Sequence, residues 1–305
     1  MNEQNNIIEA LKEIGYNFKN GSDYLSCSAL YRAGDNETAL TIYPKKNLVI
    51  DWVTNQRFTI KTLLARTLNL KTDQEINDWC QKRNVSFTPS VIIPKLKQTN
   101  IMDKSILTYF LPIHDYFIGR GISIETLQKF KGGLVQKQDS RMKNRYCFPI
   151  FNSSGEIVGV VGRSVIDQKI KVKNIGKKDQ FVFPAFLNSK IIKQKKEVIL
   201  VEGIPDVLSL FECGIENVLC LFGTECSLAI LNFLLKIDAQ KIIISLNNDE
   251  PGQAAAEKLE NKFLRYFDRK VVSIKYPPNG NKDFNQVLMT ENGKQIIKDW
   301  YLTKL

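Results

Sequence analysis

The stretch Glu197-Val-Ile-Leu-Val-Glu-Gly-Ile-Pro-Asp206 decides how the C-terminal part of this chain folds. Four apolar residues in a row, without polar alternation, are typical of a short strand buried on both faces of a parallel sheet. Pro205 then opens a helical pattern. In an open α/β sheet, side chains at the carboxyl end of a strand face the crevice where ligands bind. The pattern therefore places Glu202 in that crevice and a second acid, Asp206, four residues later.

Three further apolar runs downstream repeat this arrangement. They span residues 217–221, 241–246 and 270–275, and a helix-length segment follows each run. Such alternation predicts βαβ units with right-handed crossovers. Because the carboxyl ends of parallel strands share one edge of the sheet, we expect four acids to meet there: Glu202, Asp206, Asp249 and Asp283.

Carboxylates crowded at one edge repel each other unless cations lie among them, and hard oxygen ligands suit Mg²⁺ or Mn²⁺. We predict Glu202, Asp249 and Asp283 as metal ligands, and Glu202, Asp249 and Asp206 as catalytic acids. For each acid alone, an alternative stays open, since Asp is common at helix N-caps and in loops. Gly252 and the alanines after it predict a narrow helix whose start approaches the sheet closely.

These residues, taken in order, resemble the Toprim domain, which occurs in bacterial-type primases, topoisomerases and some nucleases. The first strand is followed by Glu-Gly-x-x-Asp, the third by Asn-Asp-x-x-Gly-x-x-Ala-Ala and the fourth by Lys-Asp. The matching residues are Glu202, Gly203, Asp206, Asp249, Gly252, Ala255, Ala256, Lys282 and Asp283. The family usually has Asp where this chain has Asn247. Asn247 offers a metal ion a carbonyl oxygen without a charge, which puts the metal affinity or the catalytic rate in question.

The charge of the chain favours a polyanionic partner. Its 305 residues include 43 Lys and Arg against 32 Asp and Glu, a formal net charge of +11. The excess is uneven, because nine lysines and one acid lie between Lys169 and Lys196. A solvated loop is one interpretation of this lysine-rich segment; a surface that tracks phosphates is the one we favour, since it accompanies a candidate metal site.

Cysteine and histidine usage indicates a reduced, zinc-free protein. Six cysteines form no Cys-x-x-Cys pair, no signal peptide opens the chain, and no apolar run approaches the roughly 20 residues that span a bilayer. We expect no membrane partner and a cytoplasmic location, in the bacterial host if the gene belongs to a phage. The lone His114 is predicted to be structural.

The N-terminal residues 1–85 predict a helix over 3–14, a small antiparallel sheet with hairpins, and helices over 59–69 and 73–83. Tyr-x-Ser-Cys at 24–27, Thr-Ile-Tyr-Pro at 41–44 and Asp51-Trp52 resemble the zinc-ribbon domain of bacterial and phage primases. A structural zinc needs four Cys or His ligands, and Cys27 alone remains at the matching positions. We therefore predict the ribbon scaffold without zinc, and expect Trp52 and Trp79 in its core.

Residues 86–104 are predicted as a linker and residues 105–194 as a basic subdomain. Tyr-x-x-x-Arg-Gly-Ile-Ser at 116–123, Phe-Pro-Ile at 148–150, Gly-Val-Val-Gly-Arg at 159–163 and Lys-x-x-Asn at 171–174 resemble the N-terminal half of the primase catalytic core. The glycines before Arg163 are expected to admit a ligand backbone. The resemblance implies a nucleic-acid and nucleotide surface formed by Arg120, Arg145, Arg163, Lys171, Asn174 and Lys282.

The predicted fold class is α+β with several domains: a zinc-ribbon-like antiparallel domain, a mixed α/β basic subdomain and, over 195–305, a Toprim domain with a parallel sheet. This order resembles a Toprim-containing DNA primase of bacterial or phage type. The resemblance implies a nucleotidyltransferase that makes short RNA primers on single-stranded DNA from ribonucleoside triphosphates. No helicase motif follows, so a separate replicative helicase is the expected partner. The lost zinc ligands and small size favour a phage or mobile-element origin.

Two alternatives remain open. One is a primase-derived protein that binds single-stranded DNA or a helicase without catalysis, which Asn247 and the lost zinc ligands favour. The other is a Toprim nuclease, which the primase-like region upstream and the absence of a topoisomerase tyrosine domain disfavour.

Overall fold

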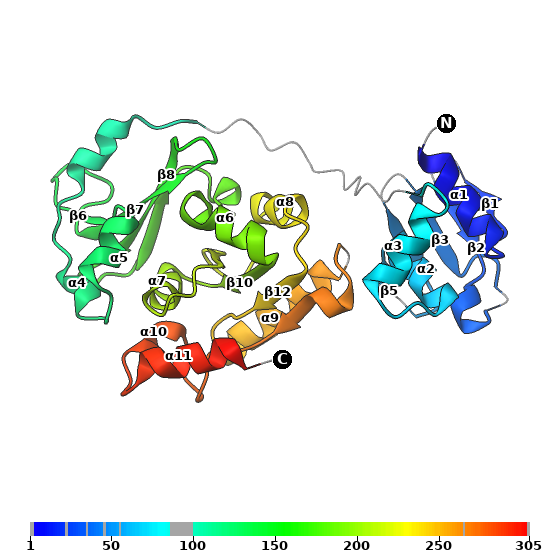
Figure 1. Cartoon of the computed structure of the whole chain (residues 1–305). Coiled ribbons are helices and arrows are strands. Elements are labelled where there is room, and N and C mark those ends of the chain that lie inside the picture. The colour runs from blue at the N-terminus through cyan, green and yellow to red at the C-terminus, as the bar shows by residue number, and fades with distance from the viewer. Residues whose placement is uncertain are drawn as a thin grey trace. The chain divides into compact units, whose positions relative to one another are not determined.

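The computed structural model describes residues 3–21, 24–34, 36–44, 47–54, 56–85, 100–264 and 266–303. Backbone contacts divide the chain into two compact units (Figure 1). Unit 1 comprises Met1–Ile93 and Asn261–Lys270, and unit 2 comprises Pro94–Glu260 and Val271–Leu305. Most of the predicted linker, residues 86–99, lies outside the described residues. Within the described part of the chain, no helix combines the length and apolar character needed to cross a bilayer.

Unit 1 is built on the antiparallel sheet that the hairpin signals predict, with its strands in the order β1-β2-β3-β4-β5. The strands are β1 (Lys19–Asn20), β2 (Leu25–Cys27), β3 (Leu40–Tyr43), β4 (Leu48–Asp51) and β5 (Gln56–Phe58). The helices are α1 (Glu3–Glu13), α2 (Ile60–Leu68) and α3 (Asp73–Gln81). Thr59 caps α2 and Thr72 caps α3, each accepting a backbone N–H, so both predicted helices begin where the sequence sets them.

A buried ionic network joins the end of β4 to the short 3₁₀ turn Leu30–Arg32. Asp51 is fully buried and accepts from Arg32 Nε at 2.9 Å, Arg32 Nη2 at 3.1 Å and Tyr31 Oη. The backbone N–H groups of Val53 and Thr54 donate to the same carboxylate at 2.9 and 3.1 Å. Burial alone raises the pKa of Asp51, but these donors outweigh it and hold the pKa well below its usual range. Asp51 is therefore a charged latch between two loops.

The two tryptophans of unit 1 differ from each other. Trp79 packs against the core, as predicted. The prediction for Trp52 is wrong, because 57% of its surface is exposed. Its indole Nε1–H donates to Thr41 Oγ1 at 2.8 Å, which holds the ring on the outside of the sheet. The Asp-Trp pair follows strand alternation: the side chain of Asp51 points inward, so that of Trp52 points out.

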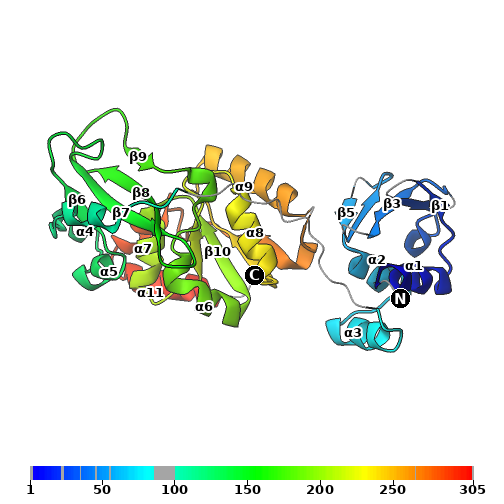
Figure 2. The same cartoon turned by 90° about the horizontal axis from the view of Figure 1, so that it is seen from above.

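Unit 2 contains an antiparallel sheet and a parallel sheet. The antiparallel order is β6-β7-β8-β9, and Figure 2 shows the long strands β7 and β8 side by side. These strands are β6 (Gly133–Val135), β7 (Arg145–Phe151), β8 (Ile157–Ser164) and β9 (Val172–Ile175). The helices of this part are α4 (Asp115–Ile118), α5 (Ile124–Lys129) and α6 (Ala185–Lys195). Ser123 caps α5 and also donates to Glu212 Oε1 at 2.6 Å.

The parallel sheet has the order β11-β10-β12-β13, so the quoted strand lies inside it. Its strands are β10 (Glu197–Val201), β11 (Val218–Cys220), β12 (Lys241–Ile244) and β13 (Val272–Ile274). Its helices are α7 (Ile204–Glu212), α8 (Leu228–Lys236), α9 (Glu250–Phe263), α10 (Phe284–Leu288) and α11 (Gly293–Leu302). Helix α10 packs against α7 and α11 (Figure 1). The alternation of β and α elements is the predicted one.

One hydrophobic core serves both sheets of unit 2. Phe148 of the antiparallel sheet, Phe130 after α5 and Phe211 of α7 belong to the same buried cluster. The predicted domain boundary between residues 194 and 195 falls inside unit 2. The division into a basic subdomain and a Toprim domain stays a prediction. The predicted structural role of His114 is consistent with its burial and with the 2.7 Å hydrogen bond between its Nδ1 and Tyr146 Oη.

We predict that Asp51→Asn lowers the free energy of unfolding of unit 1 by about 3 kcal/mol at pH 7, because Arg32 loses its buried partner. Asp51 has a depressed pKa in the folded state, so its contribution is present above about pH 4 and is lost as the pH falls further. Urea denaturation read by hydrogen-exchange mass spectrometry on β3 and β4 peptides measures both effects.

The matched control is Glu37→Gln, which removes a carboxylate from an exposed ion pair with Lys19. An exposed pair contributes about 0–1 kcal/mol, so this variant should unfold nearly as the parent does. Equal losses in the two variants, or an Asp51→Asn loss that does not shrink at all as the pH falls below about 4, would contradict the latch.

Candidate active site

The loops that follow β10, β12 and β13 bring the predicted acids to one edge of the parallel sheet. Glu202 directly follows β10, Asp249 precedes α9, and Asp283 precedes α10. Burial raises the pKa of Glu202, and the charges of Asp249 and Asp283 raise it further, while Lys282 opposes them. Each of these groups is therefore close enough to Glu202 to change its protonation.

Asp249 forms an ion pair across this edge with Lys282. Lys282 Nζ lies 2.8 Å from Asp249 Oδ2, and the N–H of Gly252 donates to Asp249 Oδ1 at 3.0 Å. The hydrogen bond from Lys282, with help from Gly252, lowers the pKa of Asp249. The backbone N–H of Asn248 donates to the carbonyl of Lys282 at 2.7 Å, which fixes the two loops to each other. The ammonium group of Lys282 thus lies where the carboxylate of Asp249 attracts positive charge.

Asp206 is buried, and both of its carboxylate oxygens accept backbone N–H groups. Oδ1 accepts from Phe284 at 2.9 Å, and Oδ2 accepts from Gly203 at 3.3 Å. Burial and the nearby charge of Asp283 raise the pKa of Asp206 to about 7, although both N–H groups lower it. These bonds tie the loop after β10 to the start of α10, so the local geometry gives Asp206 a positioning role.

The sequence left two interpretations open for the acids: helix caps, or side chains that converge at the sheet edge. The structure is compatible with both. Asp283 caps α10 by accepting from Gln286 N at 2.8 Å, and Asp249 accepts from Gly252 in the first turn of α9. Capping and convergence are compatible because the helices that follow parallel strands begin at the same edge as the acids. The caps orient the carboxylates that the sheet brings together.

The donor set fits a hard divalent cation. Burial, and after it the charges of Asp249 and Asp283, raises the pKa of Glu202. Carboxylate and amide oxygens are ligands for Mg²⁺ or Mn²⁺. Within the described ranges, no three His, Cys, Asp or Glu side chains are grouped closely enough to hold a metal ion as they stand. A cation at this edge would compete with Lys282 for Asp249.

Gly252 permits the close approach of α9 to the end of β12. A Cβ atom at position 252 would lie 2.1 Å from the carbonyl oxygen of Asn247, closer than any side chain tolerates. The predicted narrow start of this helix is therefore confirmed at Gly252. Gly203, the glycine of the first motif, has an extended backbone, and a Cβ there would meet its neighbours at 3.4 Å.

Arg145 does not face solvent. It is 3% exposed, and its guanidinium donates to the carbonyl oxygens of Ile170 at 2.8 Å and Lys171 at 3.1 Å. Burial lowers the pKa of Arg145. This placement corrects the sequence-based expectation of a phosphate contact: Arg145 closes the loop between β8 and β9. We leave it out of the proposed nucleic-acid surface.

The other predicted arginines lie together around one tyrosine. Arg163 Nε donates to Tyr116 Oη at 3.3 Å, and the Arg120 guanidinium carbon lies 5.8 Å from the Tyr116 ring centroid. The buried Nε of Arg120 has no hydrogen-bond partner among the described residues. Asn285 Nδ2 donates to the Arg120 carbonyl at 3.0 Å. Helix α10, whose cap is Asp283, is thereby attached to the arginine cluster.

The glycines of β8 make room for other side chains of the protein. A Cβ at Gly159 would lie 2.2 Å from the Phe181 ring, and one at Gly162 would lie 2.9 Å from Cys147 Sγ. The expectation that these glycines admit a ligand backbone is wrong, because side chains of the protein fill the space. Of the Lys-x-x-Asn pair, Lys171 is paired with Asp167, and Asn174 Nδ2 donates to the Gly176 carbonyl at 3.1 Å.

Lys178 is a candidate phosphate-binding residue that the sequence motifs did not identify. It begins the 3₁₀ turn η4 (Lys178–Gln180), and a Cβ at Gly223 would lie 3.3 Å from its Nζ. The N–H of Gly223 in turn donates to the Glu202 carbonyl at 3.0 Å. The lysine-rich segment therefore reaches the loop beside Glu202. The high density of lysines after Lys169 indicated a basic surface, but it did not identify Lys178 among them.

Comparisons with known proteins match this architecture. Residues 199–288 match the family model described as Toprim-like. The chain is 33% identical to a DNA primase of Borreliella burgdorferi over 156 residues, which cover 48% of this chain and 29% of that protein. It is 30% identical to a DNA primase of Clostridium acetobutylicum over 219 residues, 60% of this chain and 36% of that protein.

Over about half of its length, this chain is similar in sequence to bacterial DNA primases. It spans about a third of the length of the curated primases that it matches. A solved Aquifex aeolicus primase structure, comprising zinc-binding and RNA polymerase domains, aligns with a TM-score of 0.56 and 17% identity over 98% of this chain and 85% of that one. The DnaG primase catalytic domain bound to single-stranded DNA aligns with a TM-score of 0.55 and 20% identity, covering 65% and 75%.

At these identities the structural likeness establishes the primase fold. Because the Aquifex match covers nearly the whole chain, it includes unit 1. In unit 1, Cys27 and Cys80 are buried and unpaired, and Asp51 of the Asp-Trp motif is bound by Arg32. The absence of zinc stays a prediction.

We predict that Gly252→Ala lowers the free energy of unfolding of unit 2 by about 1–3 kcal/mol, because the new methyl group collides with the Asn247 carbonyl. Gly203→Ala is the matched control and should change it by less than about 1 kcal/mol, since its backbone is extended and its surroundings have room. Urea denaturation read by hydrogen exchange on β10 and β12 peptides compares them. Equal effects would contradict the proposed close approach.

Proposed function

We propose that this chain is a DNA primase, a nucleotidyltransferase that joins ribonucleotides into short primers on single-stranded DNA. The convergence of Glu202, Asp249 and Asp283 at the carboxyl edge of a parallel sheet, in a relative of bacterial primases, supports the proposal. Phosphoryl transfer asks a protein to position its reactants and neutralise charge, and it needs little covalent chemistry. The site has acids for a cation and, in the same unit, arginines for phosphates.

Glu202, Asp249 and Asp283, with the Asn247 amide oxygen, would hold Mg²⁺ or Mn²⁺. When bound, such ions neutralise charge on the triphosphate and polarise the primer 3′ hydroxyl. Glu202 is also proposed to accept the hydroxyl proton as the oxygen attacks the α-phosphorus and pyrophosphate leaves. Asp206 holds the loop after β10 against α10, and Lys282 leaves Asp249 for the phosphates.

Arg120, Arg163 and Lys178 are proposed to bind template or triphosphate, with Lys171 and Asn174 further along the same surface. Arginine provides a planar fork for phosphate, and lysine provides a point charge. A role in priming implies ribonucleoside triphosphates and single-stranded DNA as substrates. It also implies a separate replicative helicase as partner and the cytoplasm, of a host cell if phage-encoded, as location.

A non-catalytic DNA-binding protein derived from a primase is the second candidate. Two observations favour it: Asn247 stands where the family usually has an acid, and Lys282 already pairs with Asp249. The nuclease alternative is not favoured, because the curated relatives are named DNA primases.

We predict that the wild-type chain incorporates labelled ribonucleotides on single-stranded DNA with Mg²⁺ or Mn²⁺, and that Glu202→Gln reduces the rate by about 10²–10⁴-fold. Binding of a labelled single-stranded oligonucleotide should change little. Glu291→Gln, an exposed acid after α10, is the matched control and should keep the wild-type rate. DNA binding without incorporation by the wild type would favour the second candidate, and strand cutting would favour the nuclease.

We predict that Asn247→Asp lowers the Mg²⁺ concentration for half-maximal primer synthesis by roughly 3–10-fold, since a further carboxylate joins the acidic edge. Asn248→Asp is the control: its Oδ1 accepts from Gln253 Nε2 at 2.9 Å, so the same added charge lies on a side chain that is already engaged. A Mg²⁺ titration of the three proteins measures the shift. Equal shifts would show a general charge effect, without an Asn247 ligand.

A further inference from the structure

Asn285 is a buried side chain to which the proposed primase chemistry assigns no role. It is 1% exposed and lies in α10, two residues after Asp283. Its Nδ2 donates to the Arg120 carbonyl at 3.0 Å and to Ser209 Oγ at 3.1 Å. Arg120 belongs to the loop before α5, and Ser209 belongs to α7. One amide group therefore joins three segments that lie far apart in the sequence.

Both partners of the Asn285 amide need a donor. A backbone carbonyl has no hydrogen to give. The Ser209 hydroxyl, which is fully buried, donates its single hydrogen to the Pro205 carbonyl at 2.8 Å, so its oxygen accepts from Asn285. Two acceptors therefore meet the NH₂ end of the amide, and this fixes the direction in which the amide faces. An apolar side chain at position 285 would leave both acceptors without this donor.

The loop that carries Arg120 is also attached at two neighbouring positions. Gly121 has a φ of +79°, and a Cβ there would lie 3.4 Å from Leu288 Cδ2, so the loop passes in contact with the end of α10. Two residues further along, Ser123 donates to Glu212 Oε1 of α7 from its N–H at 2.8 Å and from its Oγ at 2.6 Å. The loop thus rests on α7 and α10, the two helices that begin at the acidic edge.

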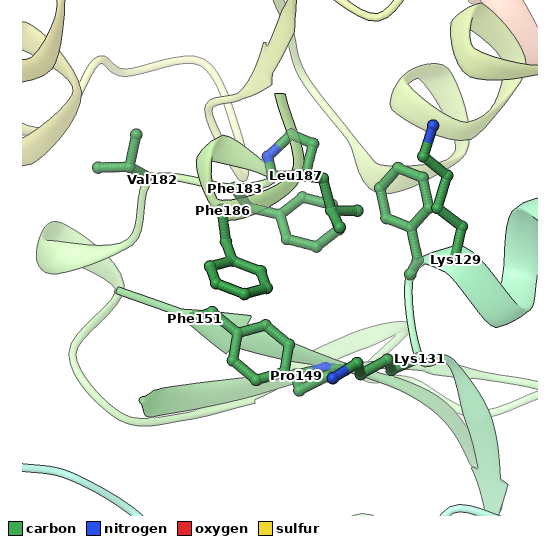
Figure 3. A pocket seen from close by; sticks show the side chains of 10 residues that line it. Lys129, Lys131, Pro149, Phe151, Val182, Phe183, Phe186 and Leu187 are labelled. Carbon is green, nitrogen blue, oxygen red and sulfur yellow. The ribbon is translucent and has the colours of Figure 1, made fainter. Parts of the chain in front are cut away.

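Helix α5, which continues from this loop, is held at its other end as well. Lys129 Nζ pairs with Glu216 Oε1 at 2.6 Å, and the Phe130 and Phe211 rings lie 4.7 Å apart between centroids. Figure 3 shows the pocket at this end of α5, which Lys129 and several aromatic rings line. A shift of Arg120 relative to α7 would therefore strain contacts at both ends of α5.

The side chain of Arg120 has a donor that the described part of the chain does not use. Its buried Nε has no hydrogen-bond partner there, and its guanidinium carbon lies 5.8 Å from the Tyr116 ring centroid. A buried donor without a partner costs free energy until an acceptor arrives. Because Asn285 bonds the Arg120 backbone to the helix that Asp283 caps, a phosphate at the acidic edge is an acceptor that suits this guanidinium.

We propose that Asn285 is a positioning residue. Through the Arg120 carbonyl, it sets where the Arg120 guanidinium lies relative to the acidic edge, so that the guanidinium binds the triphosphate of an incoming ribonucleotide. The inference rests on the proposed function, which supplies the triphosphate. Asn285 itself touches no substrate; its amide keeps the spacing between the arginine and the acids proposed to hold the metal.

Equilibrium binding of the fluorescent ATP analogue mant-ATP in the presence of Mg²⁺ tests the inference on the intact chain. Asn285→Ala should weaken this binding roughly 3–10-fold, because the loop that carries Arg120 loses its bond to α10. Arg120→Ala should weaken it at least about tenfold. In the double variant the loss should be no greater than in Arg120→Ala alone, since a positioning residue then has no side chain left to position.

Asn188→Ala is the matched control. Asn188 is also fully buried, and its Nδ2 donates to the carbonyls of Glu216 at 2.6 Å and Val218 at 2.7 Å. These acceptors lie at the amino end of β11, on the side of the sheet opposite the acids. Both variants should lose stability to urea, because each removes a buried amide that serves two acceptors. Asn188→Ala should nevertheless keep wild-type binding of mant-ATP.

Primer synthesis provides a second measurement. Asn285→Ala should raise the KM for ribonucleotides by the same factor as the Kd of mant-ATP, and it should change the affinity for a labelled single-stranded oligonucleotide by less than about twofold. A purely structural role would lower the amount of active protein, which reduces the apparent kcat and leaves the KM unchanged.

Three results of the binding experiment would overturn the inference: no saturable binding of mant-ATP by the wild type, single-variant losses that multiply in the double variant, or equal weakening by Asn188→Ala. Weaker oligonucleotide binding with unchanged mant-ATP binding in Asn285→Ala would overturn it too, since Arg120 would then serve the template. Coupled binding without primer synthesis by the wild type would contradict the proposed primase activity and keep the positioning role. Primer synthesis without coupling would do the reverse.

Discussion

Repulsion among carboxylates at one edge of the parallel sheet is the constraint on which the rest of the site depends. The chain balances it with backbone N–H groups on Asp206 and with the ammonium group of Lys282 on Asp249. Burial, and after it the charge of the neighbouring acids, still raises the pKa values of Glu202 and Asp206. An edge in this state attracts a divalent cation, while the caps and hydrogen bonds already hold its carboxylates in place. Folding thus positions the carboxylates, and we propose that a bound cation neutralises their remaining charge.

Packing connects this acidic edge to the basic half of unit 2. The aromatic cluster around Phe130, Phe148 and Phe211 gives both sheets a shared core. Asn285 then bonds the Arg120 carbonyl and Ser209 Oγ, so the helix that Asp283 caps is fixed to the arginine cluster and to α7. The groups proposed to bind phosphate and metal are built on one core, which keeps their spacing as the proposed phosphoryl transfer requires.

The contribution of the buried ion pair in unit 1 can be compared with that of a structural metal. A structural zinc contributes roughly 10–16 kcal/mol to the folding of a zinc-finger peptide, and a buried ion pair contributes far less in net terms. The latch of Asp51 and Arg32 therefore cannot replace such a metal by its own energy. The core of the unit, which includes Tyr16, Leu40 and Leu63, supplies most of the stability, and the latch selects how two loops meet.

The local order of residues determined much of the fold by itself. Unbroken apolar runs and the motif glycine at 252 indicated the elements and the edge where the acids gather, because these signals act over a few residues. Tertiary contacts decided the rest: the burial of Arg145, the exposure of Trp52, and Lys282 on Asp249. The surroundings of a side chain depend on segments that are far away in sequence. A local sequence pattern does not show which of these segments will pack against it.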